Sequence, residues 1–137
     1  MKIVSACLAG VQCNWQGEAA PCSKVISLVV AGKAMPVCPE QLGGMLIPRE
    51  PAEQRGDKVI TVSGKDVTEK FKHGAEVGLK IAALINCKGA ILKARSPSCG
   101  VGKIYDGTFT KKLILGDGIF AKMLKRSGIN VMSEEEF

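Results

Sequence analysis

Aromatic residues are scarce in this chain of 137 residues, which has one Trp, one Tyr and four Phe. A core must therefore consist mainly of Val, Ile, Leu and Ala, as expected where helices cover a buried sheet. The scarcity also argues against a groove for single-stranded nucleic acid, in which aromatic rings alternate with Lys and Arg. A net charge of +6 is compatible with an anionic partner. Nucleic-acid binding nevertheless stays a minor interpretation, because the basic residues are scattered.

A long apolar run is also missing. The N-terminus has neither the basic region nor the extended apolar stretch of a secretory signal. The longest apolar helical stretch, residues 79–85, is too short to span a bilayer. We therefore expect a cytoplasmic protein with no membrane partner. With 46% hydrophobic and 23% charged residues, residues 1–137 are predicted to form one globular domain.

Two local motifs are absent as well. None of the six cysteines forms the Cys-x-x-Cys pair of a local zinc site. Because the cytoplasm is reducing, a disulfide framework is not expected, and metal ligation by thiolates explains the cysteine count better. A Gly-x-x-x-x-Gly-Lys-Ser/Thr loop for ATP phosphates is missing, which argues against an enzyme that activates its substrate with a nucleotide.

What is present has the order of an α/β protein. Short buried strands are predicted at 3–6, 35–38, 58–62, 89–94 and 129–132, with helices at 23–32, 66–85 and 118–126. The long helix is expected to begin at Asp66, with Glu69 in a capping box. Residues 39–56, rich in Pro, Gly and charge, are expected to form an irregular functional loop. The alternation predicts a three-layer, Rossmann-like α/β fold with a mostly parallel sheet.

Three cysteines lie at or beyond the carboxyl ends of predicted strands. Cys7 and Cys38 lie at the ends of the first two strands, and Cys99 lies five residues past the strand 89–94. Because parallel strands end at one edge of a sheet, where ligands gather, these thiols are predicted to share a metal site. Two alternatives remain open. The thiols could be ordinary core residues, since free cysteine is commonly buried, or a structural zinc site completed by Cys13.

Several blocks of the sequence resemble a known family. They are Ser5–Gly10, Cys38–Gly44, Pro48–Glu53, Gly64–Thr68, Ser96–Gly100 and Ile104–Gly107. In this order they resemble the thiouracil desulfidases, a bacterial family formerly catalogued as a domain of unknown function. The resemblance extends from Lys2 to about Ser133, and the chain is similar to the short form with a single catalytic domain.

The resemblance implies a 4Fe–4S cluster held by Cys7, Cys38 and Cys99. Three thiolates for four irons leave one iron open to the soft sulfur of a substrate. The implied reaction is the non-redox desulfuration of a small-molecule thiolated pyrimidine, with 2-thiouracil or 4-thiouracil giving uracil and sulfide. A cluster-based sulfur carrier or transferase, which would deliver the sulfur to an acceptor, is the alternative.

The same chemistry requires a proton-transfer group and a surface for the ring. Glu40 is predicted to be the general base and acid, and Ser96 to orient the substrate or relay a proton. Trp15, Ser98 and Tyr105 are predicted to bind the substrate, with the two rings stacking on the pyrimidine. An ordinary loop carboxylate and ordinary turn serines are the alternative interpretations.

One segment departs from the family pattern. Where an aromatic-Asp-Gly turn is expected, Asn14–Gly17 keeps the aromatic ring and lacks the carboxylate, so the preferred thio-compound is expected to differ. Cys13 and Cys22 are expected to be bystanders, and Glu134–Glu136 a solvated end. Arg49 is either a cation that orients the substrate or a surface residue. The sequence does not determine the oligomeric state, and a homodimer is compatible with it.

Overall fold

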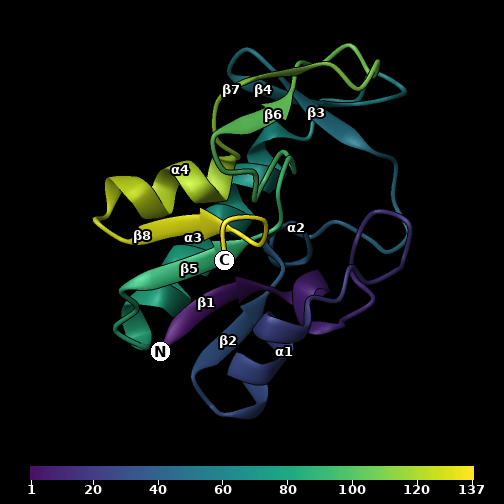
Figure 1. Cartoon of the computed structure of the whole chain (residues 1–137). Coiled ribbons are helices and arrows are strands. Elements are labelled where there is room, and N and C mark those ends of the chain that lie inside the picture. Colours follow the sequence, from purple (N-terminus) through teal and green to yellow (C-terminus); the bar gives the residue numbers. More distant parts are fainter.

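A parallel sheet forms the middle of three layers in the computed structural model, which describes all residues, 1–137 (Figure 1). The strand order is β2-β1-β5-β8. These strands are β1 (Lys2–Ser5), β2 (Ala34–Val37), β5 (Gly89–Leu92) and β8 (Asn130–Ser133). The predicted fold class is confirmed. No helix has the length and apolar character that a bilayer-spanning segment needs.

Both faces of the sheet are covered by helices. Adjacent residues of a strand point to opposite faces, so Ile3 packs in one cluster with α3 (Thr68–Leu84) and α4 (Ile119–Arg126). Its neighbour Val4 packs in a second cluster with α1 (Ser23–Val30). Figure 1 shows α1 beside β2 at one end of the sheet and α4 beside β8 at the other. Burial on both faces explains why the four strands consist mainly of apolar residues.

The segment between β2 and β5 is more regular than the sequence suggested. The expectation of an irregular loop over 39–56 was wrong in two places. A short helix, α2 (Pro39–Leu42), begins directly after β2, with proline at a first-turn position where its missing N–H costs nothing. Further on, β3 (Ala52–Arg55) pairs antiparallel with β4 (Lys58–Thr61). Proline and glycine in this segment therefore mark the ends of short elements.

A second hairpin was not predicted. Its strands are β6 (Lys103–Tyr105) and β7 (Leu113–Leu115), which pair antiparallel. Each strand has three residues, too few for a periodic pattern. In Figure 1 the two hairpins lie together above the sheet, and β3 contacts β6. They cover the carboxyl edge of the parallel strands.

The start of α3 differs from the expected capping box. The helix begins at Thr68, and the backbone N–H of Thr68 donates a hydrogen bond to the Asp66 carboxylate at 2.9 Å. Hydrogen bonds from Thr68 lower the pKa of Asp66 below its ordinary value. Glu69 is exposed and pairs loosely with Lys72 at 4.0 Å, so the predicted capping box is wrong. The hydroxyl of Thr68 instead accepts the N–H of Val59, which ties the helix to β4.

Helix α2 lies against α3 through backbone atoms. A Cβ on Gly74 would overlap the carbonyl oxygen of Pro39, and a Cβ on Gly43 would overlap that of Lys70. Only glycine permits such an approach. The contact fixes the position of α2, which directly follows Cys38.

We predict that Gly74→Ala lowers the free energy of unfolding by about 1–3 kcal/mol, the usual cost of overpacking. The loss should occur although alanine favours a helix by about 0.5–1 kcal/mol over glycine. Urea denaturation followed by circular dichroism measures it. His73→Ala changes an exposed neighbour on the same helix and should alter stability by less than about 0.5 kcal/mol. Unchanged stability of Gly74→Ala would contradict the backbone contact between α2 and α3.

Candidate active site

A cavity of about 460 Å³ lies at the carboxyl edge of the sheet. The chain passes from β1 to β2 on one side and later to β5 on the other, so this edge is the topological switch point where α/β folds bind ligands. The cavity is lined by every residue that the sequence analysis proposed as functional: Cys7, Trp15, Cys38, Glu40, Ser96, Ser98, Cys99 and Tyr105. The structure therefore brings these residues together, and their roles remain predictions.

Cys7 lies in a single 3-10 turn, η1 (Ala6–Ala9), directly after β1. Gly10 ends this turn in a left-handed conformation, with φ at 96°, and its N–H donates to the Cys7 carbonyl at 3.2 Å. Glycine adopts that conformation without strain. The chain thus turns away at the sheet edge and leaves the thiol on the cavity wall. Burial raises the pKa of Cys7 to about 11.

Cys38 precedes the first turn of α2 and lies beside Cys13. The Cys38 sulfur contacts the carbonyl oxygen of Cys13 at 3.8 Å. A hydrogen bond from the Cys13 thiol lowers the pKa of Cys38 to about 7 and raises that of Cys13. Since the thiolate is the form that binds metal, Cys38 is the most readily ionised of the three predicted ligands. Cys13, expected to be a bystander, is buried against one of them.

The loop Ser96–Gly100 is held by the N-terminus of α4. This helix has no side-chain cap. Its first free N–H groups donate to the loop instead, from Ile119 to Pro97 and from Phe120 to Ser98, both at 2.9 Å. The unsatisfied N–H groups of a helix start are thereby paired with loop carbonyls. This pairing orients the loop that carries the third cysteine.

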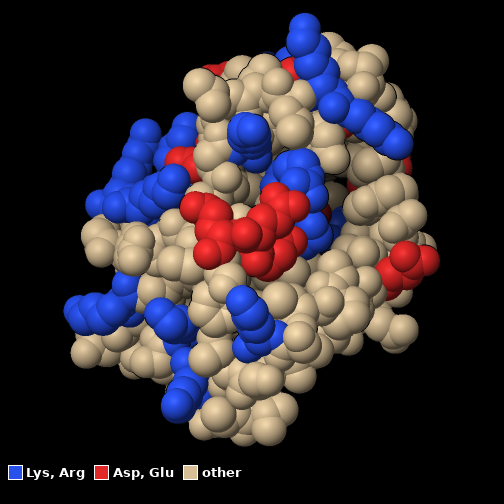
Figure 2. Space-filling view, in the orientation of Figure 1, with Lys and Arg blue, Asp and Glu red and all other residues tan.

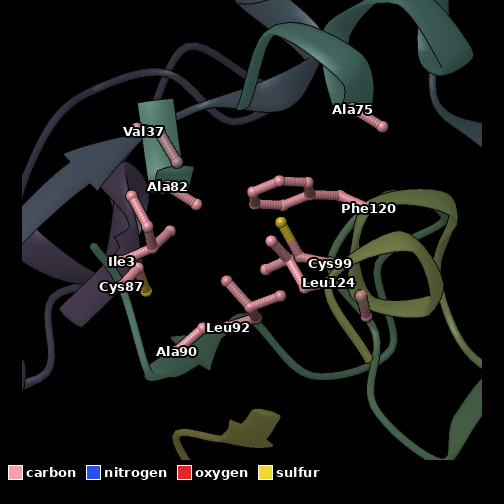
Figure 3. Close-up of a cluster of buried hydrophobic side chains, with 11 residues drawn as sticks. Ile3, Val37, Ala75, Ala82, Cys87, Ala90, Leu92, Cys99, Phe120 and Leu124 are labelled. Atoms are coloured by element: carbon pink, nitrogen blue, oxygen red, sulfur yellow. The ribbon is translucent and has the colours of Figure 1, made fainter. Parts of the chain in front are cut away.

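Cys99 sits at the border between the cavity and the core. Figure 3 shows its sulfur facing the ring of Phe120. Burial raises the pKa of Cys99 to about 12, and a hydrogen bond from the Ser5 hydroxyl offsets part of the effect. The Cys99 thiol is therefore shielded from solvent.

The donor set fits an iron–sulfur cluster better than a single metal ion. Cys7, Cys38 and Cys99 are free thiols, and the charge of Cys7 is coupled to both others. No three His, Cys, Asp or Glu side chains gather tightly enough to hold one ion. A cluster binds its thiolates through separate irons, so thiols spread around a cavity suit it. The zinc alternative with Cys13 needs four ligands around one point, which this arrangement does not provide.

The two carboxylate oxygens of Glu40 have different partners. Oε1 forms an ion pair with Nε of Arg49 at 2.9 Å, and Oε2 accepts a hydrogen bond from the Ser98 hydroxyl at 2.7 Å. The side chain of Arg49 is only 6% exposed. Its remaining nitrogens donate to the carbonyls of Cys13 at 2.9 Å and Leu46 at 3.2 Å. The side chain of Arg49 is therefore buried and holds Glu40 in place, so it is not a free surface cation.

The two serines form a directed chain toward Glu40. The Ser96 hydroxyl oxygen accepts the N–H groups of Ser98 at 3.1 Å and Cys99 at 3.0 Å. With both lone pairs occupied, Ser96 has only its proton left and donates it to the Ser98 hydroxyl, 3.0 Å away. Ser98 in turn donates to Glu40. Which serine acts in catalysis stays a prediction, but only Ser98 contacts Glu40 directly.

The aromatic wall contains one ring that the sequence analysis missed. Trp15 and Tyr105 line the cavity together with Phe109. No periodic pattern marked Phe109, because it lies in the loop between β6 and β7. Gln16, which stands where the family pattern has a carboxylate, does not line the cavity. The expected change in substrate preference therefore gains no support from this position.

The expectation that Glu134–Glu136 form a solvated end holds for Glu135 and Glu136, which are exposed, and was wrong for Glu134. Glu134 accepts the N–H of Ala94 at 2.7 Å and pairs with Lys93 at 3.1 Å. Glu135 pairs with Arg95 at 2.9 Å. In Figure 2 a group of red side chains lies where Figure 1 places the C-terminus, with Lys and Arg spread over the rest of this face. The tail thus binds the segment that leads from β5 to the cysteine loop.

Two known proteins and one family model match nearly the whole chain. The model of the family described as 2-thiouracil desulfurase matches residues 3–136. The protein named "Uncharacterized protein YbbK" from Bacillus subtilis (strain 168) is 46% identical over 99% of this chain and 97% of its own length. A solved structure of the 4Fe-4S-dependent thiouracil desulfidase TudS is 40% identical, with a TM-score of 0.94, over 99% of this chain and 91% of that one.

We predict that Arg49→Met lowers the free energy of unfolding by about 3–5 kcal/mol, because it leaves a largely buried carboxylate without its cation. Adding Glu40→Gln should recover part of the loss. Urea denaturation of anaerobically prepared protein measures both. Lys65→Met is the matched control. It breaks the exposed Lys65–Glu50 pair at 3.9 Å, which should cost less than about 1 kcal/mol. Equal losses for Arg49→Met and Lys65→Met would contradict a structural role for the Arg49 pair.

Proposed function

The chain belongs to the 2-thiouracil desulfurase family, and from this premise we propose that it desulfurises a thiolated pyrimidine without net electron transfer. The substrate would be 2-thiouracil or 4-thiouracil, and the products uracil and sulfide. One observation carries the proposal: three free thiols and the Glu40–Ser98 pair line one cavity. The cavity has the size of a small-molecule site. Because six free thiols persist best in a reducing compartment, we place the activity in the cytoplasm.

Cys7, Cys38 and Cys99 would hold a 4Fe–4S cluster in this chain. Their free thiols at three neighbouring strand ends support the assignment, as does the 40% identity to TudS, whose name states such a dependence. When bound, the cluster would supply a Lewis-acidic iron without a protein thiolate, which favours soft sulfur. The chain supplies the three thiolates and the cavity that they line.

Glu40 would manage the protons of the reaction. Replacing the thiocarbonyl sulfur by oxygen consumes one water, and both of its protons must leave with the sulfide. Oε2 of Glu40 would take the first proton as the water attacks the carbon. Arg49 holds the other oxygen at 2.9 Å, so the carboxylate cannot turn away. Ser98 donates to Oε2 at 2.7 Å and would keep it directed toward the cavity.

The aromatic residues of the wall would hold the ring. Trp15, Tyr105 and Phe109 line the cavity around the thiols. Stacking of one nucleobase on an aromatic side chain contributes about 1–3 kcal/mol. A flat and uncharged pyrimidine suits such a wall.

We predict that single substitutions will identify the three cysteines that bind the cluster. Cys7→Ala, Cys38→Ala and Cys99→Ala should each abolish the cluster after anaerobic reconstitution, because each removes one of three thiolates. Iron and sulfide analysis and the absorbance near about 400 nm measure its content. Cys22→Ala is the control and should reach about four irons per chain. Cys13→Ala should also keep its cluster, and loss of the cluster in that variant would refute the three-ligand assignment.

The function itself is tested with protein of confirmed cluster content. Under anaerobic conditions, without ATP or a reductant, 2-thiouracil or 4-thiouracil should give uracil and sulfide in equal amounts. The panel should include thiolated nucleosides. Conversion of no member would refute the enzyme assignment, and a strict need for an electron donor would refute the non-redox reaction. Sulfur delivered to an acceptor without free sulfide would favour the transferase alternative.

The same assay assigns the proton transfer. Glu40→Gln keeps the size of the side chain but removes its basicity, so turnover should fall by about 100-fold or more while the cluster forms normally. Ser98→Ala should lower turnover as well. Glu50→Gln, outside the cavity, is the control and should turn over normally. Full activity of Glu40→Gln would assign the proton transfer to another group.

A further inference from the structure

Glu53 is a second carboxylate on the cavity wall, and the reaction proposed above leaves it without a role. It lies in β3, opposite Ile60 of β4, and is 9% exposed. None of the ion pairs of the chain includes it. Burying a carboxylate without a cation is costly unless hydrogen bonds compensate. Its place in the cavity wall therefore requires an explanation.

One oxygen of Glu53 holds a loop. Oε1 accepts the backbone N–H groups of Gly107 at 3.0 Å and Phe109 at 3.1 Å. Phe109 has a positive φ of 60°, which is uncommon for a residue with a side chain and requires such support. Through these two bonds Glu53 sets the position of the Phe109 ring at the cavity.

The other oxygen of Glu53 is available to a ligand. No side chain or backbone group donates to Oε2, although every fully buried side-chain oxygen of the chain has a partner. Oε2 is therefore not fully buried, and Glu53 is one of the residues that line the cavity. Glu40 is the only other carboxylate that lines it, and both of its oxygens are engaged by Arg49 and Ser98. Of the four carboxylate oxygens on the cavity wall, Glu53 Oε2 is therefore the one that no group of the chain donates to.

We propose that Oε2 of Glu53 accepts a hydrogen bond from the N3–H of the pyrimidine and thereby selects rings that carry a proton on N3. The proposal rests on the function proposed above. N3 lies between C2 and C4, the carbons that bear sulfur in 2-thiouracil and 4-thiouracil. One acceptor can therefore recognise the same N–H in both isomers. A ring with unprotonated N3, such as 2-thiocytosine, turns a lone pair toward the carboxylate and is rejected.

Glu53→Gln tests the proposal because it changes the hydrogen-bonding character and keeps the shape. The amide oxygen can still accept from Gly107 and Phe109, which leaves the NH₂ group as a donor toward the cavity. In holoenzyme of matched cluster content, kcat/KM for 2-thiouracil should fall about 10- to 100-fold, as expected for a lost hydrogen bond to a charged group. The preference for 2-thiouracil over 2-thiocytosine should fall further. Glu50→Gln should leave that preference unchanged.

Binding gives a readout that does not depend on turnover. By calorimetry the holoenzyme should bind 1-methyluracil, which keeps N3–H, at least about tenfold more tightly than 3-methyluracil, which lacks it. Glu53→Gln should remove that difference. Glu53→Asp keeps an acceptor, so it should bind more weakly and retain the preference. Equal binding of the two methyluracils by the unaltered protein would overturn the proposal.

The outcomes separate this inference from the proposed function. If the unaltered holoenzyme desulfurises thiouracil and Glu53→Gln changes neither activity nor preference, the assignment of Glu53 is wrong and the enzyme assignment stands. If the holoenzyme desulfurises nothing, yet binds 1-methyluracil more tightly than 3-methyluracil and loses this preference in Glu53→Gln, the assignment of Glu53 stands and the enzyme assignment is wrong. An equal loss of affinity for all ligands in Glu53→Gln would show a purely structural role and would also overturn the proposal.

Discussion

Parallel pairing of β1, β2 and β5 is the constraint on which the site depends. It makes three segments that are distant in the chain end at one edge, and each supplies one cysteine to the same cavity. The local turns then differ. A left-handed glycine follows Cys7, a proline-initiated helix follows Cys38, and the start of α4 holds the loop of Cys99. In Figure 1 the two hairpins lie above this edge.

Charge inside the cavity is largely balanced by the chain itself. Arg49 pairs with Glu40, Lys93 with Glu134, and Arg95 with Glu135. These three cations line the cavity and their charge is already neutralised, whereas Lys111, which also lines it, has no ion pair. The positive net charge of the protein therefore resides mainly elsewhere on its surface. Such a cavity suits an uncharged ring that is recognised by shape and by a few hydrogen bonds.

Sequence reasoning identified what has a local signal. Buried strands and the long helices were predicted because their apolar residues recur at a fixed period, and strand ends led to the cysteines. The short elements α2, β6 and β7 carry too few residues for a period. Strand β3 is as long as the strands that were predicted, but three of its four residues are polar, so it has no apolar pattern. The contacts of Arg49, Glu53 and Phe109 could not be predicted, because their hydrogen bonds join residues far apart in the chain. Glu134 was misjudged for the same reason, since its partners Lys93 and Ala94 follow β5.

The backbone contact at Gly43 and Gly74 has a consequence for how this family can diverge. The separation of α2 and α3 is set by main-chain atoms, so most side chains on the two helices do not determine it. Substitutions elsewhere on these surfaces can accumulate while the helix that carries Glu40 keeps its place. Mutations in the surrounding helices therefore leave the geometry of the site unchanged, whereas positions 43 and 74 accept only glycine.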